Sequence, residues 1–304
     1  MSVRGAQQGR GVLLTLLILA LFAGAAAGAG YLWLASAYDA PGPAAQVSRI
    51  EVAPGTSLRA VLAALEARGV RRILCVGDVI GYNADPDECI ALLRARGAQV
   101  IAGNHDLIGT HRLGFERCSN KARYSLERTR RRLSPESVAW LTALPARLLI
   151  DSTVALVHGG VRDVQLYMTT PQHIRRNAAL LRADLPTARV CFFGHSHEQR
   201  IYGVAGEEVR ELPTNGVYHL SPDQLYFINA GSVDAQRKRT HKLAEFAVFD
   251  SAAWTVDFHR VRYDAAATEA KAAAGGYRIT PLSDWLYSLR RALQVRSSVQ
   301  SNSS

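Results

Sequence analysis

Short apolar runs alternate with polar, glycine-rich segments through the middle of the chain. Four of these runs, at residues 73–76, 99–102, 154–157 and 190–193, have the length and composition of buried strands. Helical patterns lie among them, at residues 57–70 and within 111–150, where Ser134 and Pro135 form a typical helix start. This alternation predicts an α/β domain.

The first apolar run is longer than the others and contains no charge. Residues 11–34 exceed the roughly 20 apolar residues that span a bilayer. Arg4 and Arg10 precede this run, and the next basic residue after it is Arg49, so we expect residues 1–10 to be cytoplasmic and the remainder to lie outside. The sequence therefore predicts a single-pass membrane protein. A signal peptide cleaved after Ala35-Ser36-Ala37 is the alternative, and a buried core helix is a third.

The composition limits the kinds of protein that the chain can be. Its 304 residues are 48% hydrophobic and 20% charged, which suits one globular domain with accessory segments and excludes a disordered chain. The net charge of +10 attracts phosphates, nucleic acids or anionic lipids. The arginines at 128–132 lack interleaved aromatic residues, so no nucleic-acid partner is predicted. The four cysteines form no C-x-x-C pair, which makes a cysteine zinc site improbable.

Each of the four strand-like runs is followed by a side chain that can bind a metal. These residues are, in chain order, Asp78, Asn104, His158, and the pair His195 and His197. Open α/β sheets bind ligands at the carboxyl ends of their strands. Oxygen and imidazole donors together suit Mn²⁺, Fe or Zn²⁺ rather than Ca²⁺. The pattern therefore predicts a divalent metal site.

The segments GDVIGYNADPDEC, GNHD, VHGG, GHSHE and FINAGSV resemble the calcineurin-like metallophosphoesterases, in particular their small bacterial phosphodiesterase or phosphatase branch. The resemblance covers about residues 57–260. It implies a four-layer α-β-β-α sandwich over residues 57–265, with a dinuclear metal centre between the sheets. The implied activity is hydrolysis of a phosphate-ester substrate.

The same resemblance implies a role for each site residue. Asp78 would bridge two metal ions, Mn²⁺ being expected with Fe and Zn²⁺ as alternatives. Asn104, His158 and His195 would complete one metal site, and His197 would belong to the other. His105 would stabilise the transition state or protonate the leaving oxygen, with Asp106 orienting it.

The opening D-x-H motif of that family is absent. Alignment of the helix at 57–70 puts Ile50 and Val52 where its aspartate and histidine belong, and neither can bind a metal. One metal site would then be complete, while the other would keep only Asp78 and His197. We expect either an impaired phosphoesterase holding one or two ions, or a membrane-anchored pseudo-phosphoesterase that binds without turnover.

The N-terminal residues resemble a different family. Residues 1–66 are similar to the start of endolytic murein transglycosylases, which have a basic tail, one anchor, and a strand followed by a P-x-G-T-S-like turn and a helix. Residues 35–56 are thus interpreted as a linker and transglycosylase-like leader. A lytic transglycosylase relative is the third functional hypothesis, although no catalytic domain of that family follows. A fusion within the helix at 57–70 is indicated, and a natural fusion and an assembly error both stay open.

The end of the chain completes the predicted domain. Residues 242–250 and 255–264 have the pattern of closing strands. Residues 266–304 are expected to form a C-terminal helix and a disordered polar tail. We expect Trp285, Leu286, Leu289 and Leu293 on this helix to pack on the domain rather than on a membrane.

Overall fold

The computed structural model describes residues 24, 28–29, 57–234 and 242–301 of the protein. The chain divides into two parts, Met1–Arg49 and Ile50–Ser304, and the second contains the predicted catalytic domain. The predicted tail 1–10, membrane span 11–34 and leader 35–56 lie outside the described residues, apart from three helical residues at 24, 28 and 29. Across the part that is described, no helix combines the length and apolarity needed to cross a membrane.

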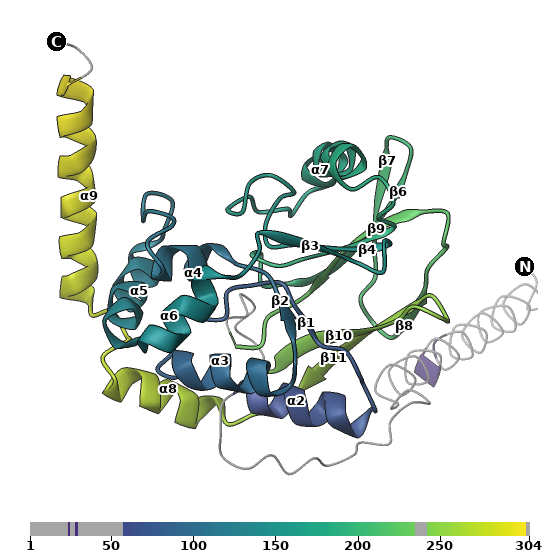
Figure 1. Cartoon of the computed structure of the whole chain (residues 1–304), viewed down its shortest axis with the longest axis horizontal. Helices are drawn as coiled ribbons and strands as arrows, with labels where there is room; N and C mark the ends of the chain where they lie inside the picture. The colour runs from purple at the N-terminus through teal and green to yellow at the C-terminus, as the bar shows by residue number, and fades with distance from the viewer. Residues whose placement is uncertain (1–23, 25–27, 30–56, 235–241, 302–304) are drawn as a thin grey trace, which may run out of the picture. The chain divides into compact units, whose positions relative to one another are not determined.

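A six-stranded mixed sheet forms the larger layer of the domain (Figure 1). Three central strands run parallel, and an antiparallel strand flanks them on one side and an antiparallel pair on the other. In spatial order the strands are β3 (Arg147–Ile150), β4 (Val154–Val157), β5 (Val190–Phe193), β9 (Leu225–Ala230), β6 (Gln199–Ala205) and β7 (Glu208–Leu212). All four residues of β4 and of β5 are buried, as their continuous apolar runs predict.

Two smaller sheets make the second layer. One is the parallel pair β1 (Leu74–Cys75) and β2 (Gln99–Val100), and the other joins β10 (Ala244–Asp250), β11 (Thr255–Val261) and β8 (Val217–His219) by antiparallel ladders. Apolar side chains from both layers share one cluster, which includes Ile101, Leu156, Phe192, Ile228 and Val256. The fold is therefore a sandwich, and the α/β class predicted from the sequence is confirmed.

Helices cover the outer faces of the two layers. On the six-stranded sheet lies α7 (Pro171–Asp184), whose Ile174 and Leu181 pack with Phe193 and Phe227. On the other layer α2 (Ser57–Ala67) packs against β10. A separate apolar cluster joins the helices α3 (Pro86–Ala95), α4 (Asn104–Gly109), α5 (Asn120–Arg132) and α6 (Pro135–Thr142). The predicted start of α6 is confirmed, since the Ser134 hydroxyl accepts a hydrogen bond from the Ser137 amide.

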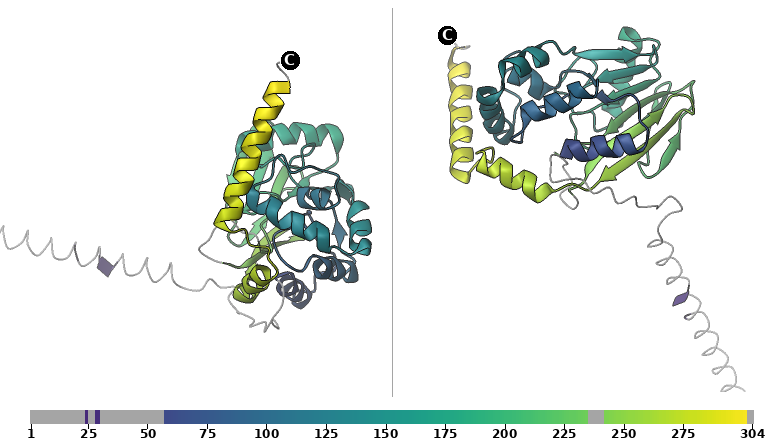
Figure 2. Two further views of the ribbon diagram at one scale, coloured as in Figure 1. Left: turned by 90° about the vertical axis from the view of Figure 1, so that its left-hand side faces the viewer. Right: turned by 60° about the horizontal axis from the view of Figure 1, so that its bottom comes forward.

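The C-terminal helices differ from the prediction. After α8 (Ala265–Ala274), α9 (Pro281–Ser301) continues through residues that were expected to be disordered. Trp285, Leu286 and Leu289 are 59%, 42% and 44% exposed, so their expected packing on the domain is wrong. The helix contacts α5 through other residues instead: the Asn120 amide donates to the Asp284 carboxylate, and Tyr287 to Glu127. Figure 2 shows α9 running along one side of the domain, and Figure 1 shows its C-terminal end projecting beyond the helices beside it.

Candidate metal centre

The loops after β1 and β2 meet because two glycines allow them to touch. A Cβ atom on Gly103 would lie 2.2 Å from the Asp78 amide nitrogen, and one on Gly77 would lie 2.4 Å from the Gly103 nitrogen. Without these side chains, Asp78 reaches the first turn of α4. The backbone amide of His105 donates a hydrogen bond of 2.9 Å to Asp78 Oδ1.

The parallel neighbours β4 and β5 bring two histidines to the same point. His158 directly follows β4, and His195 lies just beyond β5, in the left-handed region with a φ of 62°. One ligand atom from each of Asp78, His158 and His195 lies within 4.8 Å of the others. All three side chains come from strand ends in the middle of the sandwich.

His158 is oriented so that its free nitrogen faces oxygen atoms. Its Nδ1 lies 2.7 Å from the Val76 carbonyl, which can only accept, so Nδ1 carries the hydrogen and donates it. In the neutral ring, Nε2 then has a lone pair, and it lies 3.0 Å from Asn104 Oδ1 and 3.3 Å from Asp78 Oδ1. A proton or a cation at Nε2 relieves this convergence of lone pairs.

Electrostatics support the same conclusion. Burial disfavours charge on Asp78, but the charges of His105 and His158 lower the pKa of Asp78 below its ordinary value, as do hydrogen bonds from the His158 ring and the His105 backbone amide. Burial likewise opposes protonation of His158, but the charge of Asp78 raises the pKa of His158. An ionised carboxylate thus draws positive charge to the point between these residues.

His195 has a buried ring nitrogen that lacks a hydrogen-bond partner. Its Nε2 makes no hydrogen bond, and its ring packs against the ring of Tyr167 with the centroids 4.1 Å apart. Burial, with a contribution from the charge of His158, lowers the pKa of His195 to about 3. The neutral imidazole with an unused lone pair is the form that binds metals. One anionic oxygen, one amide oxygen and two imidazole nitrogens therefore fit a divalent cation such as Mn²⁺, Fe or Zn²⁺.

The structure holds His105 and Asp106 in different ways. The His105 ring rests against Gly81, where an added Cβ would lie 2.5 Å from Nδ1, and its centroid is 5.0 Å from that of Tyr82. The Asp106 carboxylate accepts hydrogen bonds from the amides of Gly103 and Ile80, at 2.8 and 3.2 Å. Among the hydrogen bonds of the described residues, none joins this carboxylate to the His105 ring. Burial, and then the charge of Asp78, raises the pKa of Asp106 to about 7.

His197 lies near the group but outside it. It is half-buried, has a φ of 58°, and its ring centroid is 6.4 Å from that of Tyr82. The group of three candidate ligands within the described residues does not include it. Ile50 and Val52, which the resemblance aligns with the absent motif, lie outside the described residues.

Asn229 supports the histidine loop, a role that the sequence analysis missed. Its side chain is fully buried, and its Nδ2 donates to the Gly194 carbonyl and the Ser196 hydroxyl, both at 2.9 Å. Its Oδ1 accepts from the Gly231 amide at 2.9 Å. The polar residue within the apolar segment FINAGSV was the signal for this role.

Comparison with known proteins gives consistent matches over this domain. The family described as the calcineurin-like phosphoesterase superfamily domain matches residues 55–253. An uncharacterized protein from Methanocaldococcus jannaschii is 30% identical over 216 residues, covering 68% of this chain and 83% of that protein.

Two crystal structures are similar to the whole domain. One is a metallophosphoesterase from Sphaerobacter thermophilus, with a TM-score of 0.60 and 28% identity over 75% of this chain and 92% of that one. The other is a hypothetical protein from Pyrococcus horikoshii OT3, with a TM-score of 0.53 and 15% identity over 73% and 89% of the two chains. The second match supports the fold alone.

Proposed function

Because the chain belongs to the calcineurin-like phosphoesterase superfamily, we propose that it is a metal-dependent hydrolase of phosphomonoesters or phosphodiesters. The observation that carries this proposal is the convergence of Asp78, His158 and His195 on one point, with lone pairs directed inward. In an ordinary packed core such a convergence would be unfavourable, because buried polar atoms need partners.

The proposed chemistry divides between a bound ion and the protein. When bound, a divalent ion lowers the pKa of water and offsets the charge of the phosphoryl oxygens. Asp78, Asn104, His158 and His195 would hold that ion. The proposed role of His105 is to stabilise the phosphoryl group or protonate the leaving oxygen, since packing against Gly81 and Tyr82 fixes its ring beside the group.

A second candidate function is binding without turnover. The described residues contain one group of three ligands, whereas catalysis by a pair of ions needs donors for two. A protein that holds a single ion, or a phosphate ligand on that ion, would have the same fold and the same first site. We therefore treat a pseudo-phosphoesterase as the alternative that the experiment must separate.

The test is hydrolysis of bis(p-nitrophenyl) phosphate and p-nitrophenyl phosphate by the full chain with added Mn²⁺. Asp78→Asn removes the anionic ligand and should lower the rate by about a hundredfold or more, since metal stabilisation contributes several kcal/mol. Asp151→Asn is the matched control, because Asp151 also has a positive φ of 47° but lies exposed beside Arg72, where it should leave the rate unchanged. Bound metal without hydrolysis of either ester, with Mn²⁺, Fe or Zn²⁺, would support the binding module instead.

Membrane attachment through residues 11–34 is a separate part of the proposal. It rests on the uncharged run and on the asymmetry of basic residues around it. Leu17→Arg together with Leu21→Arg should release the chain from the membrane fraction, because each arginine at a helix centre costs about 2.5–3.5 kcal/mol. Retention of that double variant would contradict a membrane span.

A further inference from the structure

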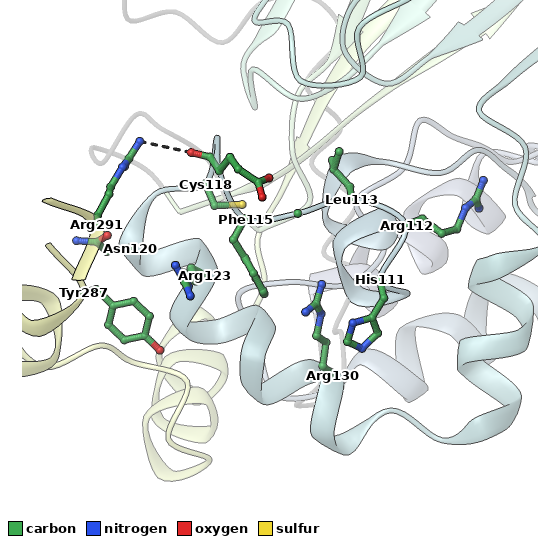
Figure 3. Close-up of a pocket in the computed structure, with 12 residues that line it drawn as sticks. His111, Arg112, Leu113, Phe115, Cys118, Asn120, Arg123, Arg130, Tyr287 and Arg291 are labelled. Carbon is green, nitrogen blue, oxygen red and sulfur yellow. Dashed lines mark hydrogen bonds between the residues drawn. The ribbon is translucent and has the colours of Figure 1, made fainter. Parts of the chain in front are cut away.

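A cavity separate from the metal centre lies between the loop after α4, the helix α5 and the base of α9 (Figure 3). Its volume is about 450 Å³, which is within the range of small-ligand sites. None of the candidate metal ligands lines it. The two sites lie at opposite ends of α4, because Asn104 begins this helix and the cavity lining begins at His111, just after it.

The lining of the cavity is strongly cationic. It contains the arginines Arg112, Arg123, Arg130 and Arg291, against the single acidic residue Glu116. Arg123 pairs with Glu127 at 3.0 Å, but the ion pairs among the described residues include none for the other three arginines. Those three donate to neutral backbone carbonyls instead, Arg130 Nε to that of Ile108 at 2.7 Å and Arg112 to that of Thr142 at 3.0 Å. Positive charge therefore exceeds negative charge at this point.

Two of the guanidinium groups pack on the same aromatic ring. Arg123 and Arg130 both lie over the ring of Phe115, at 5.2 and 4.4 Å from its centroid, and Figure 3 shows them flanking it. Arg130 is partly buried, and burial lowers its pKa although the charge of Glu127 opposes this shift. A partly buried positive charge with a second positive charge across the ring is stabilised when an anion lies beside it.

We propose that this cavity binds a small anion through its phosphate group, at a site distinct from the metal centre. Guanidinium groups donate paired hydrogen bonds that match the geometry of phosphate oxygens, and Arg123 and Arg130 are already ordered by Phe115. Arg291 extends from α9 toward the same cavity, where its guanidinium lies 3.5 Å from the Glu116 carbonyl. Free phosphate and a phosphorylated small molecule share this chemistry.

The experiment measures binding to the full chain by isothermal titration with inorganic phosphate and with ethylphosphonate, a stand-in for an esterified phosphate that resists hydrolysis. Asp78→Asn is the background, because it removes the anionic ligand from the metal centre. On that background Arg130→Gln should weaken binding by about tenfold or more, as a charge-assisted hydrogen bond is lost. Arg131→Gln is the matched control: Arg131 neighbours Arg130 on α5 but does not line the cavity, and its loss should change affinity by less than about twofold.

A second variant distinguishes a loss of binding from a loss of stability. Arg130 also donates to the Ile108 carbonyl, so its replacement can destabilise α4. Arg291 is exposed, and Arg291→Gln should weaken binding while leaving the thermal unfolding temperature unchanged. Tighter binding of ethylphosphonate indicates an esterified ligand and tighter binding of phosphate the free ion; either result supports the site. The proposal is overturned if the Asp78→Asn chain binds neither probe, or if Arg130→Gln and Arg291→Gln both bind as Arg131→Gln does.

Discussion

Asn229 offers a test of how the metal centre is built, because its hydrogen bonds reach no candidate ligand yet fix the loop that carries His195. Two of its hydrogen bonds reach Gly194 and Ser196, on either side of His195, and the third joins it to Gly231 at the end of its own strand. Asn229→Ala removes all three bonds without adding charge or bulk. The variant should therefore loosen the His195 loop while leaving every ligand side chain in place.

The magnitude follows from the bonds that are lost. A neutral hydrogen bond contributes a net amount of about 1 kcal/mol, so three such bonds amount to about 3 kcal/mol of unfolding free energy. For a domain of this size, that corresponds to a fall of about 6–12 °C in melting temperature. Residues that orient metal ligands affect metal affinity by about 10- to 100-fold, so Mn²⁺ affinity should fall within that range.

The assay pairs thermal unfolding with Mn²⁺ titration of the same protein. Leu181→Ala is the control, since Leu181 lies on the buried face of α7, is 1% exposed, and its truncation should cost about 2–5 kcal/mol away from the metal centre. We expect both variants to lose stability and only Asn229→Ala to lose affinity. Equal Mn²⁺ affinity in Asn229→Ala and the wild type, or an equal loss in Leu181→Ala, would refute the positioning role of Asn229.

Two further predictions concern the same centre. Gly103→Ala should abolish tight metal binding, measured as metal content after dialysis, because its Cβ would lie 2.2 Å from Asp78 Oδ1. Gly103 has an ordinary φ of −88°, so this close contact and not backbone strain would cause the loss. Removal of metal with a chelator should lower the melting temperature, since an ion present at a hundred times its Kd stabilises the folded state by about 2.7 kcal/mol; an unchanged melting temperature would contradict binding by the folded protein.

The sequence was most informative where a strand end determines the position of a side chain. The apolar runs that became β4 and β5 were recognisable because both strands are buried on two faces. As parallel neighbours, these strands bring His158 and His195 together at one edge of the sheet, and that meeting was predictable from the order of motifs. The positions of these candidate ligands could therefore be predicted from short local motifs and from the parallel direction of the strands that precede them.

Features that depend on tertiary contacts were harder to predict. The arginines at 128–132 have the pattern of a solvated helix face, yet Arg130 lies over Phe115 in a cavity that also needs α9. The apolar residues Trp285 and Leu286 suggested packing, but α9 uses Tyr287 and Asp284 for its contacts with α5. In each case the partner lies far away in the sequence, so local periodicity could not identify it.

The second layer of the sandwich is divided beside the metal centre. Among the described residues, β1 and β10 belong to separate sheets. Yet their apolar side chains share clusters on both faces of the layer. Ile73 packs with the cluster that contains Phe246, and Leu74 and Phe249 pack against the cluster between the two layers. Neighbouring strands of one sheet lie about 4.8 Å apart and are joined by hydrogen bonds. Because β1 and β10 share apolar clusters but no hydrogen-bonded ladder, these two strands are separated from each other within the layer.

The separation of β1 from β10 bears on the number of metal ions that the protein can hold. The absent D-x-H motif belongs to an opening strand in the resembling family, and the residues aligned with it, Ile50 and Val52, lie outside the described part of the chain. If Asp78, His158 and His195 are the ligands that matter, purified protein should hold one ion per chain. Two tightly held ions per chain would instead require donors beyond this group, such as His197, which the resemblance assigns to a second ion. That result would favour the two-ion phosphoesterase over the mononuclear one.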